Sequence, residues 1–327
     1  MDYKPLVSVI IPVYMVENWL PICLDSLCRQ SLSHIEILLI DDASPDNSGV
    51  ICEKYAEMDA RFKVFHHSEN KGLSVARNTG IYNSTCDYLM FVDSDDFVHV
   101  DFCKKAYECA LRYHADLVMF NSQRIKKNIF TRKRTLRLLH VNASNNVSSG
   151  YKTRTEAIGL LHNCVGQAVW NKLYRKELFN NTLFPKGSLA EDIGTIYKIV
   201  WNSSSIYYLN DVLYYYCQHS GSLTTIQSKK SEQDWIEMFL KQYHDLSVWG
   251  YPAELLEILL LNIAMSYCIQ KRTDYSDAYY NYFSTILQDS SIIPKEVSWK
   301  KKCLFFLFRH CKSLFELLCT IYGLKRW

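Results

Sequence analysis

This sequence of 327 residues lacks the signatures of several common protein classes. No C-x-x-C pair occurs among its 12 cysteines, so no zinc site is predicted and most thiols are expected to be small core residues. No G-x-G-x-x-G motif follows the first predicted strand, which argues against a nicotinamide-dependent dehydrogenase. The formal net charge of +3 is too small to predict binding to nucleic acid.

Signals for export and membrane insertion are also missing. Residues 1–5 run straight into a predicted strand without a charged start or a cleavage site, so no signal peptide is expected. Many cysteines without an export signal predict reduced thiols and a cytoplasmic protein. The apolar run Leu255–Ile269 is short for a bilayer span and contains Glu257, so we interpret it as a core helix.

The first part of the chain alternates strand and helix patterns. An apolar fraction of 48% and a charged fraction of 22% are typical of a globular chain, long enough for one large domain or for a catalytic domain and a smaller appendage. Strand and helix patterns alternate over the ranges 6–13, 17–30, 35–40, 48–58, 62–66, 70–83 (a turn over 70–74 leading into a helix) and 88–92. This order predicts an α/β fold, Rossmann-like, with a mostly parallel sheet and helices on both faces.

Polar and aromatic residues follow three of these strands. Pro12–Tyr14 ends the first, Asp41-Asp42 the second, and Asp93, Asp95 and Asp96 follow the fourth. Parallel strands share one polarity, so these residues meet at one edge of the sheet, where α/β proteins bind ligands. Clustered carboxylates repel one another unless a cation lies between them, and oxygen ligands suit Mg²⁺ or Mn²⁺ held together with substrate phosphates. The pattern therefore predicts a metal–diphosphate site.

Each of these signals has a simpler interpretation. An Asp-x-Asp spacing is expected about once by chance in a chain of this length. Asp41 and Asp42 are equally suited to cap the next helix, and Tyr14 to lie in the core. The convergence of all three strand ends on one rim favours the ligand site.

Beyond residue 97 the patterns are less regular. We predict helices over 101–113, 155–163 and 191–201, a strand over 116–122, a closing β-pair over 205–209 and 212–219, and loops over 142–150 and 220–224. The basic segment 124–137 is either a solvated loop or a contact for an acidic acceptor or a lipid headgroup.

The last third is predicted to be helical over 235–246, 253–270, 278–287 and 297–322. From Lys295 to Trp327, eight basic residues face two acidic ones, a net charge of +6, and apolar residues recur at helical spacing. Such a basic amphipathic helix is typical of a membrane interface. The alternatives are that it packs on the catalytic domain or pairs in a homodimer.

Six stretches, in this order along the chain, resemble those of inverting GT-A-fold glycosyltransferases of glycosyltransferase family 2. The stretches are Ser8–Tyr14, Ile40–Ser44, Gly72–Asn78, Phe91–Asp96, Trp170–Tyr174 and Glu191-Asp192. Two positions differ from the family pattern: Met15 stands where Asn often follows the Tyr, and Ala43 where Gly is frequent. Neither difference removes a carboxylate.

The resemblance implies a role for individual residues. On the nucleotide side, Tyr14 would stack on the uracil, Asp42 would hydrogen-bond it, and Arg77 would help to hold the nucleotide. Further residues implied around the sugar nucleotide are Pro12, Glu17, Asp93 and Ser94, with Asp93 facing the ribose or the donor sugar. The metal on the diphosphate would be held by Asp95 and His219, the general base would be Asp192, and the acceptor would contact Trp170 and Glu191.

The implied function is transfer of a hexose or N-acetylhexosamine from a UDP-sugar, with Mn²⁺ or Mg²⁺, to a hydroxyl of a glycan or lipid-linked acceptor. Attack from one face with one base gives inversion. The expected setting is surface-polysaccharide synthesis on the cytoplasmic face of the cell membrane, bound to anionic lipid. The catalytic domain would span 1–224, with a nucleotide-binding half at 1–97 and an acceptor-binding half at 98–224, and residues 225–327 would form the helical region.

Two rival interpretations remain. A haloacid-dehalogenase-type phosphatase also uses Asp-x-Asp, but after its first strand, where Val13-Tyr14 stands here. A catalytically inactive, sugar-nucleotide-binding scaffold protein is the alternative from another functional class. The presence of Asp93, Asp95 and the Glu191-Asp192 pair argues against it.

Overall fold

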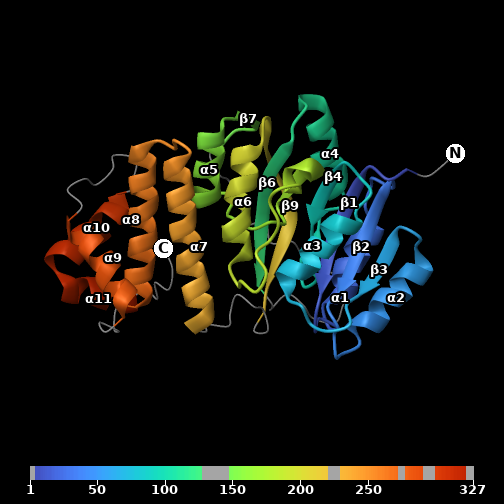
Figure 1. The fold of residues 1–327 in the computed structure, drawn as a ribbon, viewed down its shortest axis with the longest axis horizontal. Coiled ribbons are helices and arrows are strands. Elements are labelled where there is room, and N and C mark those ends of the chain that lie inside the picture. Colours follow the sequence, from blue (N-terminus) through green and yellow to red (C-terminus); the bar gives the residue numbers. More distant parts are fainter. Residues whose placement is uncertain (1–3, 127–146, 220–228, 272–276, 290–298, 322–327) are drawn as a thin grey trace. The chain divides into compact units, whose positions relative to one another are not determined.

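The computed structural model describes residues 4–126, 147–219, 229–271, 277–289 and 299–321 (Figure 1). The chain forms two compact units, Met1–Met238 and Phe239–Trp327. Their boundary falls inside helix α7 (Lys229–Val248). The domain boundary predicted at residue 224 lies outside the described residues, as do most of the basic segment 124–137, the loop 220–224 and the end of the chain from residue 322.

In the described residues, the first unit is built on a nine-stranded sheet. The strands are β1 (Val7–Val13), β2 (Ile35–Asp41), β3 (Phe62–His66), β4 (Tyr88–Phe91), β5 (Phe97–Val98), β6 (Leu117–Lys126), β7 (Gly150–Lys152), β8 (Lys172–Arg175) and β9 (Ile206–Gln218). The helices are α1 (Leu20–Cys28), α2 (Ser48–Met58), α3 (Leu73–Asn83), α4 (Phe102–Tyr113), α5 (Arg154–Asn163), η2 (Lys176–Phe179) and α6 (Glu191–Asn202).

The strand order is β3-β2-β1-β4-β8-β6-β9-β5, with β7 paired to β9. Strands β3, β2, β1 and β4 are parallel to one another. Strand β8 is antiparallel to both β4 and β6, so β6 runs in the same direction as β4. The predicted α/β fold with a mostly parallel sheet is confirmed, and the antiparallel pairs are those of β8, β5 and β7.

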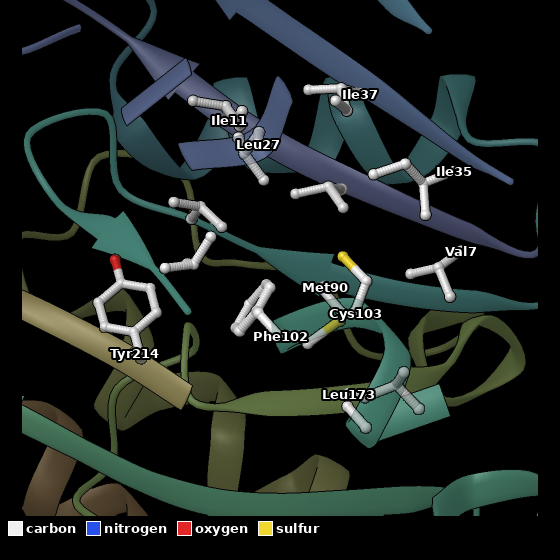
Figure 2. Packing of buried hydrophobic residues seen from close by; sticks show 14 of the residues in the cluster. Val7, Ile11, Leu27, Ile35, Ile37, Met90, Phe102, Cys103, Leu173 and Tyr214 are labelled. Atoms are coloured by element: carbon white, nitrogen blue, oxygen red, sulfur yellow. The ribbon is translucent and has the colours of Figure 1, made fainter. Parts of the chain in front are cut away.

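Every residue of β1 and β2 is buried. This is the pattern expected of parallel strands that are covered by helices on both faces of the sheet. On one face, Val7, Ile11 and Ile35 pack with Leu27 of α1 and Phe102 of α4 (Figure 2). On the other face α3 lies very close to the sheet. A Cβ added at Gly80 would lie only 2.2 Å from Cγ2 of Ile10. Glycine at this position therefore sets how near α3 comes to β1.

The predicted closing β-pair is wrong. Residues 206–218 form one long strand, β9, parallel to β6, and the register is irregular between Phe120 and Ser122. A bulge absorbs the turn-forming residues Asn210 and Asp211 within the strand, so the chain does not reverse there. The strand continues to Gln218, and this brings His219 to the carboxyl edge of the sheet.

The second unit contains α8 (Ala253–Gln270), α9 (Ala278–Asp289), α10 (Trp299–His310) and α11 (Lys312–Ile321). The predicted single helix over 297–322 is wrong, because the helix is interrupted at Cys311. The interruption lets Phe308 and Phe315 pack edge to face, with ring centroids 5.1 Å apart and both rings buried. Among the described helices none is long and apolar enough to span a bilayer.

Candidate active site

Arg77 of α3 joins carboxylates from distant parts of the chain. Its Nη1 donates to Oε1 of Glu191 and Oδ1 of Asp192, each at 2.7 Å, and its Nη2 donates to Oδ1 of Asp93 at 3.0 Å. The guanidinium is fully buried, and its central carbon lies 5.3 Å from the ring centroid of Phe184. The acidic groups that follow β4 and open α6 therefore lie in one cluster. The observed partners of Arg77 are carboxylates, whereas the resemblance implied a nucleotide contact.

Local structure explains why Arg77 lies there. The close approach of α3 to β1 at Gly80 holds the helix over the sheet, one turn beyond Arg77. Asn78 binds both backbone groups of Phe184: its Nδ2 donates to the carbonyl at 2.9 Å, and its Oδ1 accepts from the N–H at 3.0 Å. The Phe184 ring is thereby fixed against the guanidinium.

Asp192 lies in the first turn of α6 and uses both carboxylate oxygens. Oδ1 accepts from Arg77, and Oδ2 accepts from the backbone N–H of Val169 at 3.1 Å. Burial raises the pKa of Asp192 to about 7, and the charges of Glu191 and Asp93 add to this against the opposing charge of Arg77. A carboxyl that titrates near neutrality is well matched to general base catalysis.

The loop after β4 is fixed by Asp96, the third carboxylate of the cluster that predicted a metal–diphosphate site. Its Oδ2 accepts from the Tyr214 hydroxyl at 2.6 Å, and its Oδ1 accepts from the N–H of Cys217 at 2.7 Å. The same hydroxyl accepts from the N–H of Asp93 at 3.1 Å. Burial, with the charges of Asp95 and Asp93, raises the pKa of Asp96 well above its usual range. Asp96 thus anchors the loop to β9.

Asp95 and His219 lie together at the predicted metal position. Nε2 of His219 is 2.8 Å from Oδ2 of Asp95, and the imidazole stacks on Trp19 at 4.5 Å. Within the described parts of the chain, no three His, Cys, Asp or Glu side chains gather as a metal cage. A divalent ion on a diphosphate needs only one or two carboxylates beside phosphate oxygens. Asp95, partly exposed beside His219, fits an ion that arrives with its nucleotide.

Asp42 forms a second group at the end of β2. Its Oδ1 accepts from Lys71 N at 2.9 Å and lies 2.6 Å from Nδ1 of His67, and its Oδ2 accepts from Gly72 N at 2.7 Å. Nε2 of His67 lies 3.0 Å from the hydroxyl of Thr79. Asp42 therefore fixes the turn into α3, the helix that carries Arg77.

The other predicted nucleotide residues lie near this edge. Tyr14 follows β1 and is 41% exposed, and the neighbouring Val13 carbonyl accepts from Asp42 N at 2.9 Å. Pro12 is buried within β1, and Ser94 is buried in the loop after β4. Oε2 of Glu17 accepts from the N–H and the side-chain amide of Asn47, so it ties the loop after β1 to the start of α2.

Of the predicted acceptor residues, Glu191 is buried against Arg77. Trp170 is half-buried, and its ring stacks on Tyr214 at 4.2 Å with the planes 13° apart. Tyr216 lies parallel to it at 5.9 Å. Sequence reasoning missed Tyr214 and Tyr216. Both lie within the predicted strand 212–219, and their i, i+2 spacing on one face of a strand was the available signal. That spacing alone does not reveal that this face packs against Trp170.

A mixed α/β sheet with carboxylates at the ends of its parallel strands is an enzyme-like scaffold that binds ligands at that edge. Residues 8–183 match the family described as Glycosyl transferase family 2. The chain belongs to this family, and it is a glycosyltransferase with the GT-A-like fold that the resemblance implied. The C-terminal helices predicted from their sequence pattern are also present.

Individual proteins give the extent of the likeness. Glycosyltransferase GlyA of Streptococcus pneumoniae serotype 4 is 33% identical over 273 residues, which cover 78% of this chain and 38% of GlyA. Glycosyltransferase GlyG of the same organism is 30% identical over 80% of this chain and 87% of its own length. A crystal structure of S. aureus TarS 1-349 in complex with UDP-GlcNAc has a TM-score of 0.63 at 20% identity, covering 98% of this chain and 93% of TarS 1-349.

Proposed function

We propose that this glycosyltransferase transfers a hexose or N-acetylhexosamine from a UDP-sugar to a hydroxyl of a glycan acceptor, with inversion at the anomeric carbon. The observation that carries the proposal is the Arg77 cluster, in which Asp93 and Asp192 bind one guanidinium. It holds the proposed base beside the loop proposed to bind the sugar donor. A UDP-sugar as the donor is further supported by S. aureus TarS 1-349, which has a similar fold and was crystallised in complex with UDP-GlcNAc.

In the proposed reaction, Asp192 accepts the proton of the acceptor hydroxyl as the oxygen attacks the anomeric carbon. The new C–O bond forms while the bond between the anomeric carbon and the diphosphate oxygen breaks, and UDP leaves with the electron pair. A positioned carboxylate base contributes typically ~10²–10⁴-fold to the rate. One displacement from one face inverts the anomeric centre.

The leaving diphosphate carries negative charge into a site already lined by Asp93 and Asp95. Asp95 and His219 would hold Mn²⁺ or Mg²⁺ there, and the bound ion would supply Lewis-acid neutralisation worth several kcal/mol. The exposed ring of Tyr14 and the carboxylate of Asp42 are proposed to bind the uracil, and Trp170 the acceptor. The inactive-scaffold alternative is set aside because the chain belongs to a family of glycosyltransferases.

The decisive test uses Asp192→Asn in the full chain. UDP release should be lost, because an amide accepts no proton at neutral pH, while UDP binding measured by calorimetry should be unchanged. Asp116→Asn is the matched control, since Asp116 pairs with Arg175 outside the cluster and its loss should leave turnover intact. Near wild-type turnover of Asp192→Asn would refute the base assignment. UDP release measured over a panel of UDP-sugars identifies the donor sugar. Its loss when a chelator replaces Mn²⁺ shows that the reaction needs a metal ion.

We also propose that the acceptor is lipid-linked in surface-polysaccharide synthesis, and that the second unit binds anionic membrane. Phe306 of α10 and Leu314 of α11 remain 57% and 41% exposed, and the same two helices carry Lys302, Arg309 and Lys312. Phe306→Ser with Leu314→Ser should reduce co-sedimentation with phosphatidylglycerol vesicles, whereas Tyr82→Ser, at an 87% exposed aromatic residue in the first unit, should not. Unchanged co-sedimentation of the double variant would contradict membrane binding. If the wild-type protein is a homodimer in solution and the double variant is a monomer, these two residues serve self-association instead.

A further inference from the structure

The segment Trp170–Tyr174 contains three polar side chains to which the proposed reaction gives no role. Asn171, Lys172 and Tyr174 are all fully buried. Burial of a lysine is costly unless its ammonium group is hydrogen-bonded. The contacts of these side chains show that they converge on one loop, residues 165–171.

Lys172 makes three hydrogen bonds, one for each proton of an ammonium group. Its Nζ donates to the carbonyl of Gly166 at 3.2 Å, to the carbonyl of Ala168 at 2.6 Å and to Oδ1 of Asn171 at 2.7 Å. A neutral amine has only two protons, so this arrangement suits the charged form.

The two neighbouring polar residues bind two further carbonyls of the loop. Nδ2 of Asn171 donates to the carbonyl of Val165 at 2.7 Å, and the hydroxyl of Tyr174 donates to the carbonyl of Val169 at 2.8 Å. The side chains of Asn171, Lys172 and Tyr174 therefore fix the conformation of the loop through its carbonyl groups. That conformation directs the N–H of Val169 to Oδ2 of Asp192.

We propose that Lys172 is a positioning residue for Asp192: it fixes the loop that presents the Val169 N–H to Oδ2, and its positive charge favours the ionised carboxylate. This inference rests on the proposed function, in which Asp192 is the general base. Lys172 touches neither reactant. It acts on the reaction through the geometry and the charge of Asp192.

The charges around Asp192 support this role. Arg77 from α3, Asp93 from the loop after β4, Glu191 from α6 and Lys172 from β8 all act on it. Burial lowers the pKa of Lys172 to about 7, and the charge of Asp192 opposes this decrease. Burial also raises the pKa of Tyr174, and the negative charge of Asp192 increases it further. Three carboxylates, Asp192, Glu191 and Asp93, share the one guanidinium of Arg77, so the ammonium of Lys172 offsets part of the remaining negative charge.

Two substitutions separate the charge from the hydrogen bonds. Lys172→Met removes both, and Lys172→Gln keeps amide protons for the carbonyls but removes the charge. For both variants kcat should fall about 10- to 100-fold, the order expected for a misplaced catalytic group. The ascending limb of the kcat/KM pH profile should move upward by about one pH unit, because a nearby cation lowers a carboxyl pKa. UDP binding should be unchanged.

Two controls make the test specific. Tyr174→Phe removes one hydrogen bond to the loop but no charge, so kcat should fall without a shift of the pH limb. Lys176→Met removes a lysine bound to the Ser84 carbonyl, away from Asp192, and should change neither quantity. If Lys172→Met does not fold, Lys172→Gln and Tyr174→Phe still decide the outcome.

The possible results distinguish this inference from the proposed function. If Asp192→Asn is inactive but Lys172→Gln keeps the wild-type kcat and pH profile, the positioning role is wrong and the base assignment stands. If kcat falls in Lys172→Gln with no shift of the pH limb, Lys172 is merely structural and the proposal fails. If Asp192→Asn is active, the proposed function itself fails.

Discussion

Asp93 and Asp192 accept hydrogen bonds from the same guanidinium, at 3.0 and 2.7 Å, although they belong to elements far apart in the chain. The shared partner is Arg77, which also binds Glu191. A planar group with five donors in a fixed geometry is suited to bridge several carboxylates. Arg77 therefore fixes the distance between the loop proposed to bind the sugar donor and the proposed base.

Replacement of this guanidinium by an ammonium tests the bridge. Arg77→Lys should lower kcat at least about 100-fold, because a point charge cannot hold carboxylates at both positions. It should also lower the free energy of unfolding, by up to the ~3–5 kcal/mol that is lost when a buried ion pair is broken. UDP release and urea unfolding measure the two effects. Arg175→Lys, at the more exposed pair with Asp116, is the control, and full activity of Arg77→Lys would exclude the bridging role.

The pH dependence follows from Asp192, whose pKa burial raises to about 7. Base catalysis needs the carboxylate, so kcat/KM should rise with pH up to about 7 and level off above it. The folded state binds this proton more tightly than the unfolded chain, in which an aspartate titrates near ~3.9. The contribution of Asp192 to the free energy of unfolding is therefore full below about pH 4 and is lost as pH rises through about 7.

Both effects can be measured against a variant without this proton. Urea unfolding of Asp192→Asn should lack the part of the pH dependence that Asp192 contributes to the wild-type protein. A kcat/KM profile that is flat through neutral pH would show that protonation of Asp192 does not slow the reaction, which would contradict its role as the base.

Gly80→Ala tests the close approach of α3 to the sheet. The added methyl group would lie 2.2 Å from Cγ2 of the buried Ile10, so the helix must move outward and carry Arg77 with it. Overpacking of this kind costs about 1–3 kcal/mol. We expect a lower urea midpoint and a larger loss of kcat than of UDP affinity. Gly159→Ala in α5 meets nothing within 4 Å and should be stabilising by about 0.5–1 kcal/mol. Equal effects of both changes would contradict the explanation.

Much of the secondary structure could be predicted because its patterns are dense and local. The predicted ranges 48–58, 62–66 and 253–270 are those of α2, β3 and α8. One error lies where a distant partner decides the structure, because the pairing of β9 with β6 overrides the turn residues Asn210 and Asp211. The other lies at Cys311, where a break in a continuous helical pattern lets Phe308 and Phe315 pack.

The candidate site shows the same division. Strand polarity was sufficient to bring Asp42 and Asp95 to one edge of the sheet. It could not reveal the partners of Arg77, because their positions depend on the path of the chain from β4 to α6. Nor could it reveal the Val169 N–H, since a backbone group has no signature in sequence.

Ala43→Gly tests one of the two departures from the family pattern. Ala43 and Met15 both adopt left-handed backbone conformations, with φ of 57° and 52°. This conformation costs a residue other than glycine roughly 1–2 kcal/mol, which explains why Gly and Asn suit these positions. Ala43→Gly should raise the free energy of unfolding, by less than this amount because glycine gains entropy in the unfolded chain. Ala157→Gly in α5 should lower it by about 1 kcal/mol or more. Urea denaturation compares the two, and a destabilised Ala43→Gly would mean that the methyl group of Ala43 contributes more than its strain costs.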